Sequence, residues 1–129
     1  MYRMKSTTTL YRPTGQPELD LVAASGYQAW PPRLPEQPIF YPVTNEEYAA
    51  QIAREWNTTD ETNGNVGYVT RFEIDSEWLA QFPVQKVGGR VHTEYWIPAE
   101  RVEEMNQQIV GKIEVIRKFT PQGEEQINK

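Results

Sequence analysis

The segment WPPRLPEQP, residues 30–38, places the strongest constraint on the fold of this chain, because four of its nine residues are proline. Proline fixes the backbone angle φ and lacks an N–H, so such a run is stiff, extended and unable to join a helix or a central strand. Regular structure is therefore expected before and after this segment and not within it. The segment itself is either a rigid connector across the surface or one wall of a cleft.

Three helices are predicted from the spacing of apolar residues and from the residues that start or stop helices. The clearest covers residues 45–57, because Thr44 and Glu47 form a capping box before it and its apolar side chains fall on one stripe. A second is expected over residues 17–25, with proline in its first turn and glycine after its end. A third is expected over residues 98–110, between another proline and another glycine.

Strands are predicted wherever apolar and polar residues alternate or short apolar runs occur between turn signals. They cover residues 8–12, 39–43, 68–74, 84–87, 91–97 and 112–119. The strands at 84–87 and 91–97 are expected to form a hairpin around Gly88 and Gly89. A polar loop at 58–67 precedes the third strand, and one or two helical turns capped by Asp75 or Ser76 follow it. Because strands and helices do not alternate regularly as βαβ units, the expected class is α+β.

The length of 129 residues is sufficient for one domain with one hydrophobic core. We expect a flexible N-terminus at 1–7, a folded domain at 8–119 and a polar tail at 120–129. No apolar run approaches the roughly 20 residues that cross a bilayer, and no apolar core follows the basic N-terminal residues as in a secretory signal. With no cysteine there is no disulfide framework, and the expected location is cytoplasmic.

Composition also excludes several classes of function. A formal net charge of −5 argues against nucleic acid as a partner, since nonspecific binding to phosphates requires a basic surface. A single histidine and no cysteine leave no ligand set for zinc, so no metal is expected. No phosphate-binding P-loop or strand-linked G-x-G-x-x-G motif occurs. Adjacent acidic pairs such as Glu103 and Glu104 are expected to be solvated, because neighbours on a helix do not face each other.

The segment TEYWIP, residues 93–98, carries the most informative pattern. Glu94 stands on an expected strand, four residues before Pro98, with aromatic and aliphatic residues between them. This pattern resembles the glutamate segment of the ADP-ribosyltransferase superfamily. The resemblance implies that Glu94 is the catalytic residue. It also implies that His92, two residues earlier, occupies the place of a second polar residue that helps to select the acceptor.

Two earlier segments resemble the other motifs of that superfamily. IFYPVTNEEYAAQIA, residues 39–53, is similar to its middle motif, and Tyr41 would correspond to a tyrosine that stacks on nicotinamide. LYR, residues 10–12, is similar to its first motif, in which an arginine contacts the dinucleotide. The order along the chain, arginine then tyrosine then glutamate, is the order of the superfamily.

More narrowly, five segments are similar to small bacterial proteins labelled "ADP-ribosylation/crystallin J1". They are LYRPTG, PPRLPEQPIFYPV, YAAQIAREWN, GYVTRFEID and WIPAE, which together span about residues 8–119. The implied fold is an ADP-ribosyltransferase-like split β-sheet with short flanking helices. The implied function is transfer of ADP-ribose from NAD to an unknown protein or small-molecule acceptor, or cleavage of NAD. The chain combines an arginine of one branch with a tyrosine of the other, and it has YPVT where the arginine branch has a serine–threonine–serine run.

The residue types suit this chemistry. Breaking the bond between nicotinamide and ribose develops positive charge on the sugar, which a fixed carboxylate such as Glu94 opposes. An aromatic face at Tyr41 can stack on the pyridine ring, and the planar guanidinium of Arg12 suits diphosphate or ribose oxygens. The NAD-binding residues implied by the resemblance are therefore Arg12, Tyr41, Tyr11, Thr44 and His92.

Other interpretations of the same residues remain open at this point. Arg12 could pair with a surface carboxylate such as Glu18, Tyr41 could belong to the core, and Glu94 could face solvent. The alternative function is a non-catalytic module on the same fold that binds a nucleotide or a protein. Transfer chemistry on a phosphorylated RNA end is a third reading, which the acidic charge disfavours.

Overall fold

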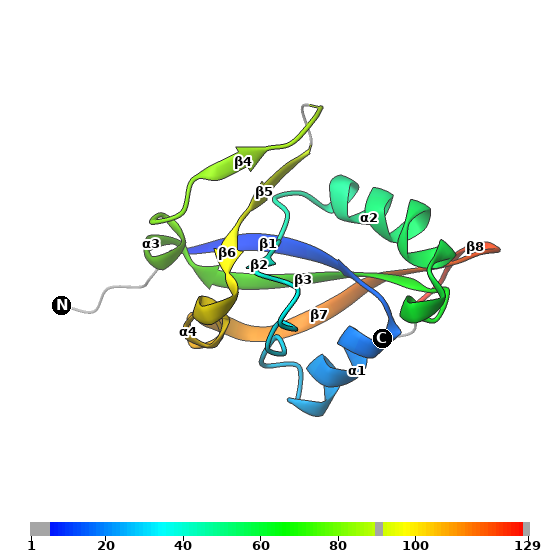
Figure 1. The fold of residues 1–129 in the computed structure, drawn as a ribbon, viewed down its shortest axis with the longest axis horizontal. Coiled ribbons are helices and arrows are strands. Elements are labelled where there is room, and N and C mark those ends of the chain that lie inside the picture. Colours follow the sequence, from blue (N-terminus) through cyan, green and yellow to red (C-terminus); the bar gives the residue numbers. More distant parts are fainter. Residues whose placement is uncertain (1–5, 90–91, 128–129) are drawn as a thin grey trace.

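The largest sheet consists of four antiparallel strands in the order β1-β3-β7-β8 (Figure 1). They are β1 (Thr7–Thr14), β3 (Gly67–Asp75), β7 (Ile109–Thr120) and β8 (Gly123–Glu125). The structure is a computed structural model that describes residues 6–89 and 92–127. In this part of the chain it is one small domain with several sheets and four α-helices, which confirms the predicted α+β class.

The alternation along β1 and β3 divides the core between the two faces of this sheet. Leu10 lies opposite Phe72 in the register, and both are completely or almost completely buried on one face. Helices α1 (Gln16–Ala24) and α4 (Val102–Asn106) cover that face. Helix α2 (Glu46–Glu55) covers the other face, where its three alanines pack with Val69. Figure 1 shows α2 on one side of the strands and α1 and α4 on the other.

Two short antiparallel pairs lie beside the large sheet. Strand β2 (Ile39–Phe40) pairs with β6 (Ile97–Pro98), and β4 (Val84–Lys86) pairs with β5 (Thr93–Tyr95). Val43 links the β4–β5 pair to the large sheet, because it forms one isolated bridge with Tyr11 of β1 and another with Glu94 of β5. The β4–β5 pair confirms the predicted hairpin, but the expected strand at 91–97 is interrupted, because Ile97 pairs with Phe40 of β2 and not with β4. Residues 90 and 91 lie outside the described residues.

Local differences from the predicted elements have identifiable causes. Helix α2 is capped by Asn45, whose side chain accepts a hydrogen bond of 2.8 Å from the Tyr48 N–H, and not by Thr44. The hydroxyl of Thr44 instead bonds to Thr93 on the neighbouring strand. Asp75 rather than Ser76 caps the short helix α3 (Ser76–Leu79).

The predicted helix at 98–110 is wrong in length. The structure has one 3₁₀ turn at Ala99–Arg101 and then α4, and β7 begins at Ile109. Ile109 and Val110 pair with β3, and this long-range pairing overrides the local helical pattern. Strand pairing also orders Gly123–Glu125, within the expected polar tail, and the expected loop at 58–67 contains 3₁₀ turns at its start. None of the helices in the described residues is long and apolar enough to cross a membrane.

Gly67 allows β3 and α2 to touch through their backbones. A Cβ atom at this position would meet the carbonyl oxygen of Ala53 and lie 2.8 Å from the Ala53 Cα atom. Gly67→Ala should therefore force α2 away from the sheet and lower the free energy of unfolding by about 2–3 kcal/mol, as overpacking does. Urea denaturation followed by far-UV circular dichroism measures this. Gly89→Ala is the control, because the nearest described atom to its new Cβ is in the His92 ring at 3.6 Å. Equal stabilities for the two variants would contradict this close packing of β3 against α2.

Candidate functional site

A cavity of about 340 Å³ opens where β1 separates from the segment at 41–43. It is lined by Arg12, Pro13, Tyr41, Val43, Ile52, Asn57 and Glu94. Cavities of this size accept small molecules or parts of cofactors. A larger groove of about 580 Å³ lies between α2 and Arg117, but its lining is mainly charged and contains none of the predicted site residues.

The cavity exists because strand pairing stops after one residue pair. Tyr11 and Val43 exchange two backbone hydrogen bonds, of 2.9 and 2.7 Å. Beyond this pair the segment at 39–41 turns to pair with β6, whereas β1 continues along β3. The Arg12 guanidinium spans the resulting fork and donates from Nη1 to the Tyr41 carbonyl oxygen at 3.2 Å. Arg12 thus replaces part of the missing strand pairing.

Arg12 forms a two-pronged ion pair with Glu18 of α1. Its Nε and Nη2 atoms lie 2.5 and 2.9 Å from the two carboxylate oxygens, and its guanidinium lies 4.4 Å from the centre of the Phe40 ring. Burial alone would raise the pKa of Glu18, but the charge and hydrogen bonds of Arg12, with the charge of Arg33, lower it. The sequence left open whether Arg12 pairs with Glu18 or lies at a binding site. In the structure Arg12 does both, because it pairs with Glu18 and also lines the cavity.

Glu94 is only 8% exposed, so it does not simply face solvent. The Tyr48 hydroxyl of α2 donates to one of its carboxylate oxygens at 2.9 Å, and the Trp96 indole N–H donates to the other at 2.8 Å. Burial, followed by the hydrogen bond to Glu94 and the charge of Glu94, raises the pKa of Tyr48 to about 12. Tyr48 therefore remains a protonated donor throughout the physiological range, and the two donors fix the orientation of the carboxylate at the cavity.

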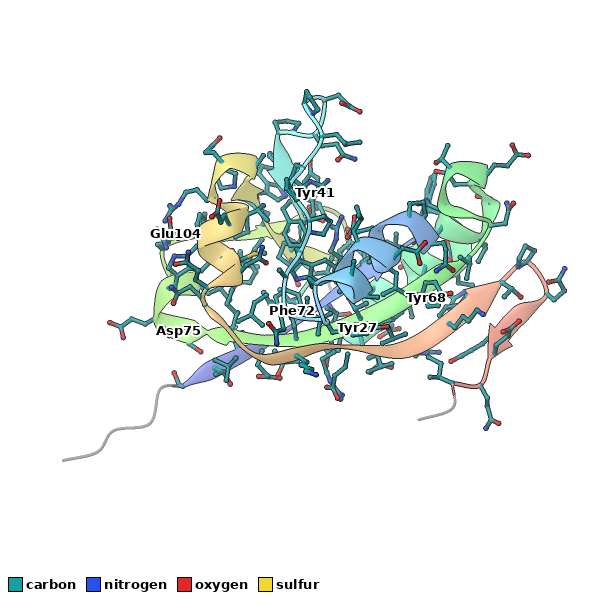
Figure 2. All side chains as sticks on the ribbon, turned by 90° about the horizontal axis from the view of Figure 1, so that it is seen from below. Tyr27, Tyr41, Tyr68, Phe72, Asp75 and Glu104 are labelled. Atoms are coloured by element: carbon teal, nitrogen blue, oxygen red, sulfur yellow. The ribbon has the colours of Figure 1, made fainter. Side chains whose placement is uncertain are left out.

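Tyr41 is not a core residue, because 39% of it is exposed and it lines the cavity. Figure 2 shows Tyr41 on the segment that stands away from the β3 and β7 ribbons, far from Tyr27 and Phe72. The arginine, the tyrosine and the glutamate predicted from the sequence thus come together at one cavity.

The other predicted binding residues lie beside the cavity lining and are not part of it. Tyr11 packs against the core under α2, and Thr44 bonds to Thr93 at the join between strands. The His92 ring lies against Tyr48, with 4.8 Å between ring centres, and its Nε2 atom is 2.9 Å from the side-chain oxygen of Gln51.

Three residues that bond to Glu94 or line the cavity were not among the predicted site residues. Trp96 was detectable, because a residue two positions after Glu94 on a strand points to the same face. Tyr48 was counted as part of an apolar stripe, although a buried phenol needs a hydrogen-bond partner. Asn57 had no sequence signal. Its side-chain oxygen is buried and has no hydrogen-bond partner among the described residues, which leaves an acceptor beside the cavity.

Within residues 6–89 and 92–127, no group of three acidic or histidine side chains is arranged to hold a metal ion. Comparisons of the chain with protein-family models, with curated proteins and with solved structures gave no match.

Proposed function

We propose that this chain is an ADP-ribosyltransferase-like protein that binds NAD in the cavity and transfers ADP-ribose to an acceptor or cleaves NAD. The observation that supports the proposal is the meeting of Arg12, Tyr41 and Glu94, from three separate segments, at one cavity. The fork between β1 and the segment at 41–43 is compatible with the split sheet that the sequence resemblance implies.

In this proposal Glu94 stabilises the transition state. The bond between ribose C1′ and the nicotinamide nitrogen breaks, its electron pair leaves with nicotinamide, and positive charge develops on the sugar. A carboxylate held by Tyr48 and Trp96 needs no reorganisation to oppose that charge. Water or a nucleophilic group of the acceptor then attacks C1′ and loses its proton to the surrounding solvent or to Glu94.

The other residues that line the cavity suit the nicotinamide end and the phosphate end of NAD. Tyr41 offers an exposed ring for stacking on nicotinamide. Arg12 uses three of its five N–H groups on Glu18 and Tyr41, so two remain for phosphate oxygens.

The burial of Glu94 favours a second candidate function. A carboxylate that is only 8% exposed and already bonded to two donors suits a module that recognises a nucleotide without turning it over. The two candidates share the binding site and differ in the release of nicotinamide.

Calorimetric titration with NAD tests the binding that both candidates require. Wild type should bind with a dissociation constant below about 1 mM, and Tyr41→Ala should weaken binding about three- to tenfold through loss of stacking. Tyr27→Ala is the matched control, because Tyr27 has a similar exposure, 37% against 39%, does not line the cavity and lies apart from Tyr41 (Figure 2). Absence of heat at millimolar NAD, or equal affinities for the two variants, would contradict the proposal.

A further inference from the structure

Two arginine side chains approach a single carboxylate beside the cavity. Arg12 forms the two-pronged pair with Glu18, and Arg33 from the proline-rich segment places its Nη1 atom 3.7 Å from the same carboxylate. Two guanidinium groups against one carboxylate leave one positive charge unbalanced. Among the described residues, no second carboxylate contributes to the electrostatics of Arg33, because the other group that does so, the Tyr41 phenol, is neutral at physiological pH.

The Arg33 side chain is largely enclosed, but its polar atoms have few partners. Its side chain is 9% exposed, and its Nε atom has no hydrogen-bond partner in the part of the chain that the structure describes. At 3.7 Å the contact with Glu18 is an ion pair and not a hydrogen bond. Burial, followed by repulsion from Arg12, lowers the pKa of Arg33 more than Glu18 and Tyr41 raise it. A buried cation with unused donors costs stability, and in a native structure it requires an explanation.

The arrangement around the two arginines is suited to an oxyanion. The guanidinium carbons of Arg12 and Arg33 lie 4.4 and 5.6 Å from the centre of the same Phe40 ring, which holds both groups over one aromatic surface. Each planar guanidinium can present paired N–H groups to phosphate oxygens. The stiff proline-rich backbone keeps Arg33 in place at little cost in conformational entropy when a ligand binds.

We propose that Arg33, together with Arg12, forms a binding site for a phosphoryl group, supplied in the NAD complex by the diphosphate of the dinucleotide. The assignment of this phosphate to NAD rests on the proposed function, whereas the anion site itself rests on the unbalanced charge and the unused donors. Arg33 does not line the cavity itself, so the phosphoryl group would lie at its edge, between Arg12 and the proline-rich segment.

The experiment compares three probes by calorimetry at one fixed, low salt concentration. Inorganic pyrophosphate reports on the anion site alone, nicotinamide riboside reports on the cavity without phosphate, and NAD reports on both. Arg33→Gln should weaken pyrophosphate and NAD binding about 10- to 100-fold, as loss of charge-assisted hydrogen bonds does, and leave nicotinamide riboside unchanged. Arg101→Gln is the control. Arg101 ends the 3₁₀ turn before α4 and pairs with Glu104, so its removal takes away the same charge and should change none of the three affinities.

Thermal unfolding of the free protein shows whether Arg33 serves ligand binding or only stabilises the fold. Arg33→Gln should unfold at the wild-type temperature or above it, because it removes a buried charge that Arg12 repels. Arg33→Lys keeps the charge but loses the planar fork, so its affinity for pyrophosphate should lie between those of wild type and Arg33→Gln.

The outcomes are distinguishable. Three results would overturn the inference. Arg33→Gln could bind pyrophosphate and NAD as tightly as wild type does, or wild type could bind neither probe. The unfolding temperature of Arg33→Gln could also fall more than about 5 °C below that of wild type. Unchanged binding in Arg33→Gln would overturn the anion site but leave the proposed function intact, because NAD would still bind. Binding of pyrophosphate that depends on Arg33, without any binding of NAD or nicotinamide riboside, would support the anion site and overturn the proposed function.

Discussion

Glu94→Gln should lower the rate of nicotinamide release from NAD about 100- to 1,000-fold, the effect of removing one preorganised electrostatic contact from a transition state. The substitution keeps the size of the side chain but removes the negative charge opposed to the developing sugar cation. Because Tyr48 and Trp96 both donate to the carboxylate, the new amide can accept from one of them only. Chromatographic measurement of nicotinamide at saturating NAD gives the rate.

Two controls make this result specific. Glu114→Gln removes a carboxylate that is 56% exposed and paired with Arg71 on the sheet, and it should leave the rate unchanged. Calorimetry should show that Glu94→Gln still binds NAD, since the loss concerns the transition state and not the ground state. A Glu94→Gln protein with the wild-type rate would refute the catalytic assignment, and a wild type that binds NAD without releasing nicotinamide would leave the non-catalytic candidate.

Trp30→Ala should lower the free energy of unfolding by about 3–5 kcal/mol, the usual cost of removing a buried tryptophan. Trp30 is 1% exposed, and its ring centre lies 5.4 Å from that of Phe40 and from that of Phe72. The Asn106 side chain also fixes its backbone, by accepting from its N–H and donating to its carbonyl oxygen, each at 2.9 Å. The substitution therefore empties the centre of the core beneath Arg12.

Urea denaturation followed by far-UV circular dichroism measures this loss without relying on tryptophan fluorescence. Trp56→Ala is the matched control, because Trp56 is 69% exposed and its removal should change stability by less than about 0.5 kcal/mol. Trp30→Phe should fall between wild type and Trp30→Ala. A loss below about 1 kcal/mol for Trp30→Ala would show that the core is not organised around this ring.

Elements with a strong local pattern could be predicted, and elements fixed by distant contacts could not. The stripe of helix 45–57 and the alternation at 68–74 both correspond to observed elements, α2 and β3. The prediction that Thr44 caps α2 was wrong, because the adjacent Asn45 can also cap the helix and does so. The Thr44 hydroxyl instead bonds to Thr93, which lies 49 residues later in the sequence. The predicted helix at 98–110 was too long because β3 pairs with the first residues of β7.

The same distinction applies to the candidate site. Arg12 and Glu18 are six residues apart, so their pairing was open to prediction as one alternative. The contact between Tyr48 and Glu94 spans 46 residues and follows only from the fold. Arg33 was treated as part of a stiff segment, because nothing near it in the sequence indicates that its side chain is buried against Glu18.

A crystal structure with NAD tests the central claim most directly. We predict electron density for NAD in the cavity, with nicotinamide against Tyr41, a ribose hydroxyl within about 3 Å of Glu94, and the diphosphate beside Arg12 and Arg33. An empty cavity in crystals soaked at millimolar NAD, or NAD bound elsewhere with Glu94 untouched, would contradict the account.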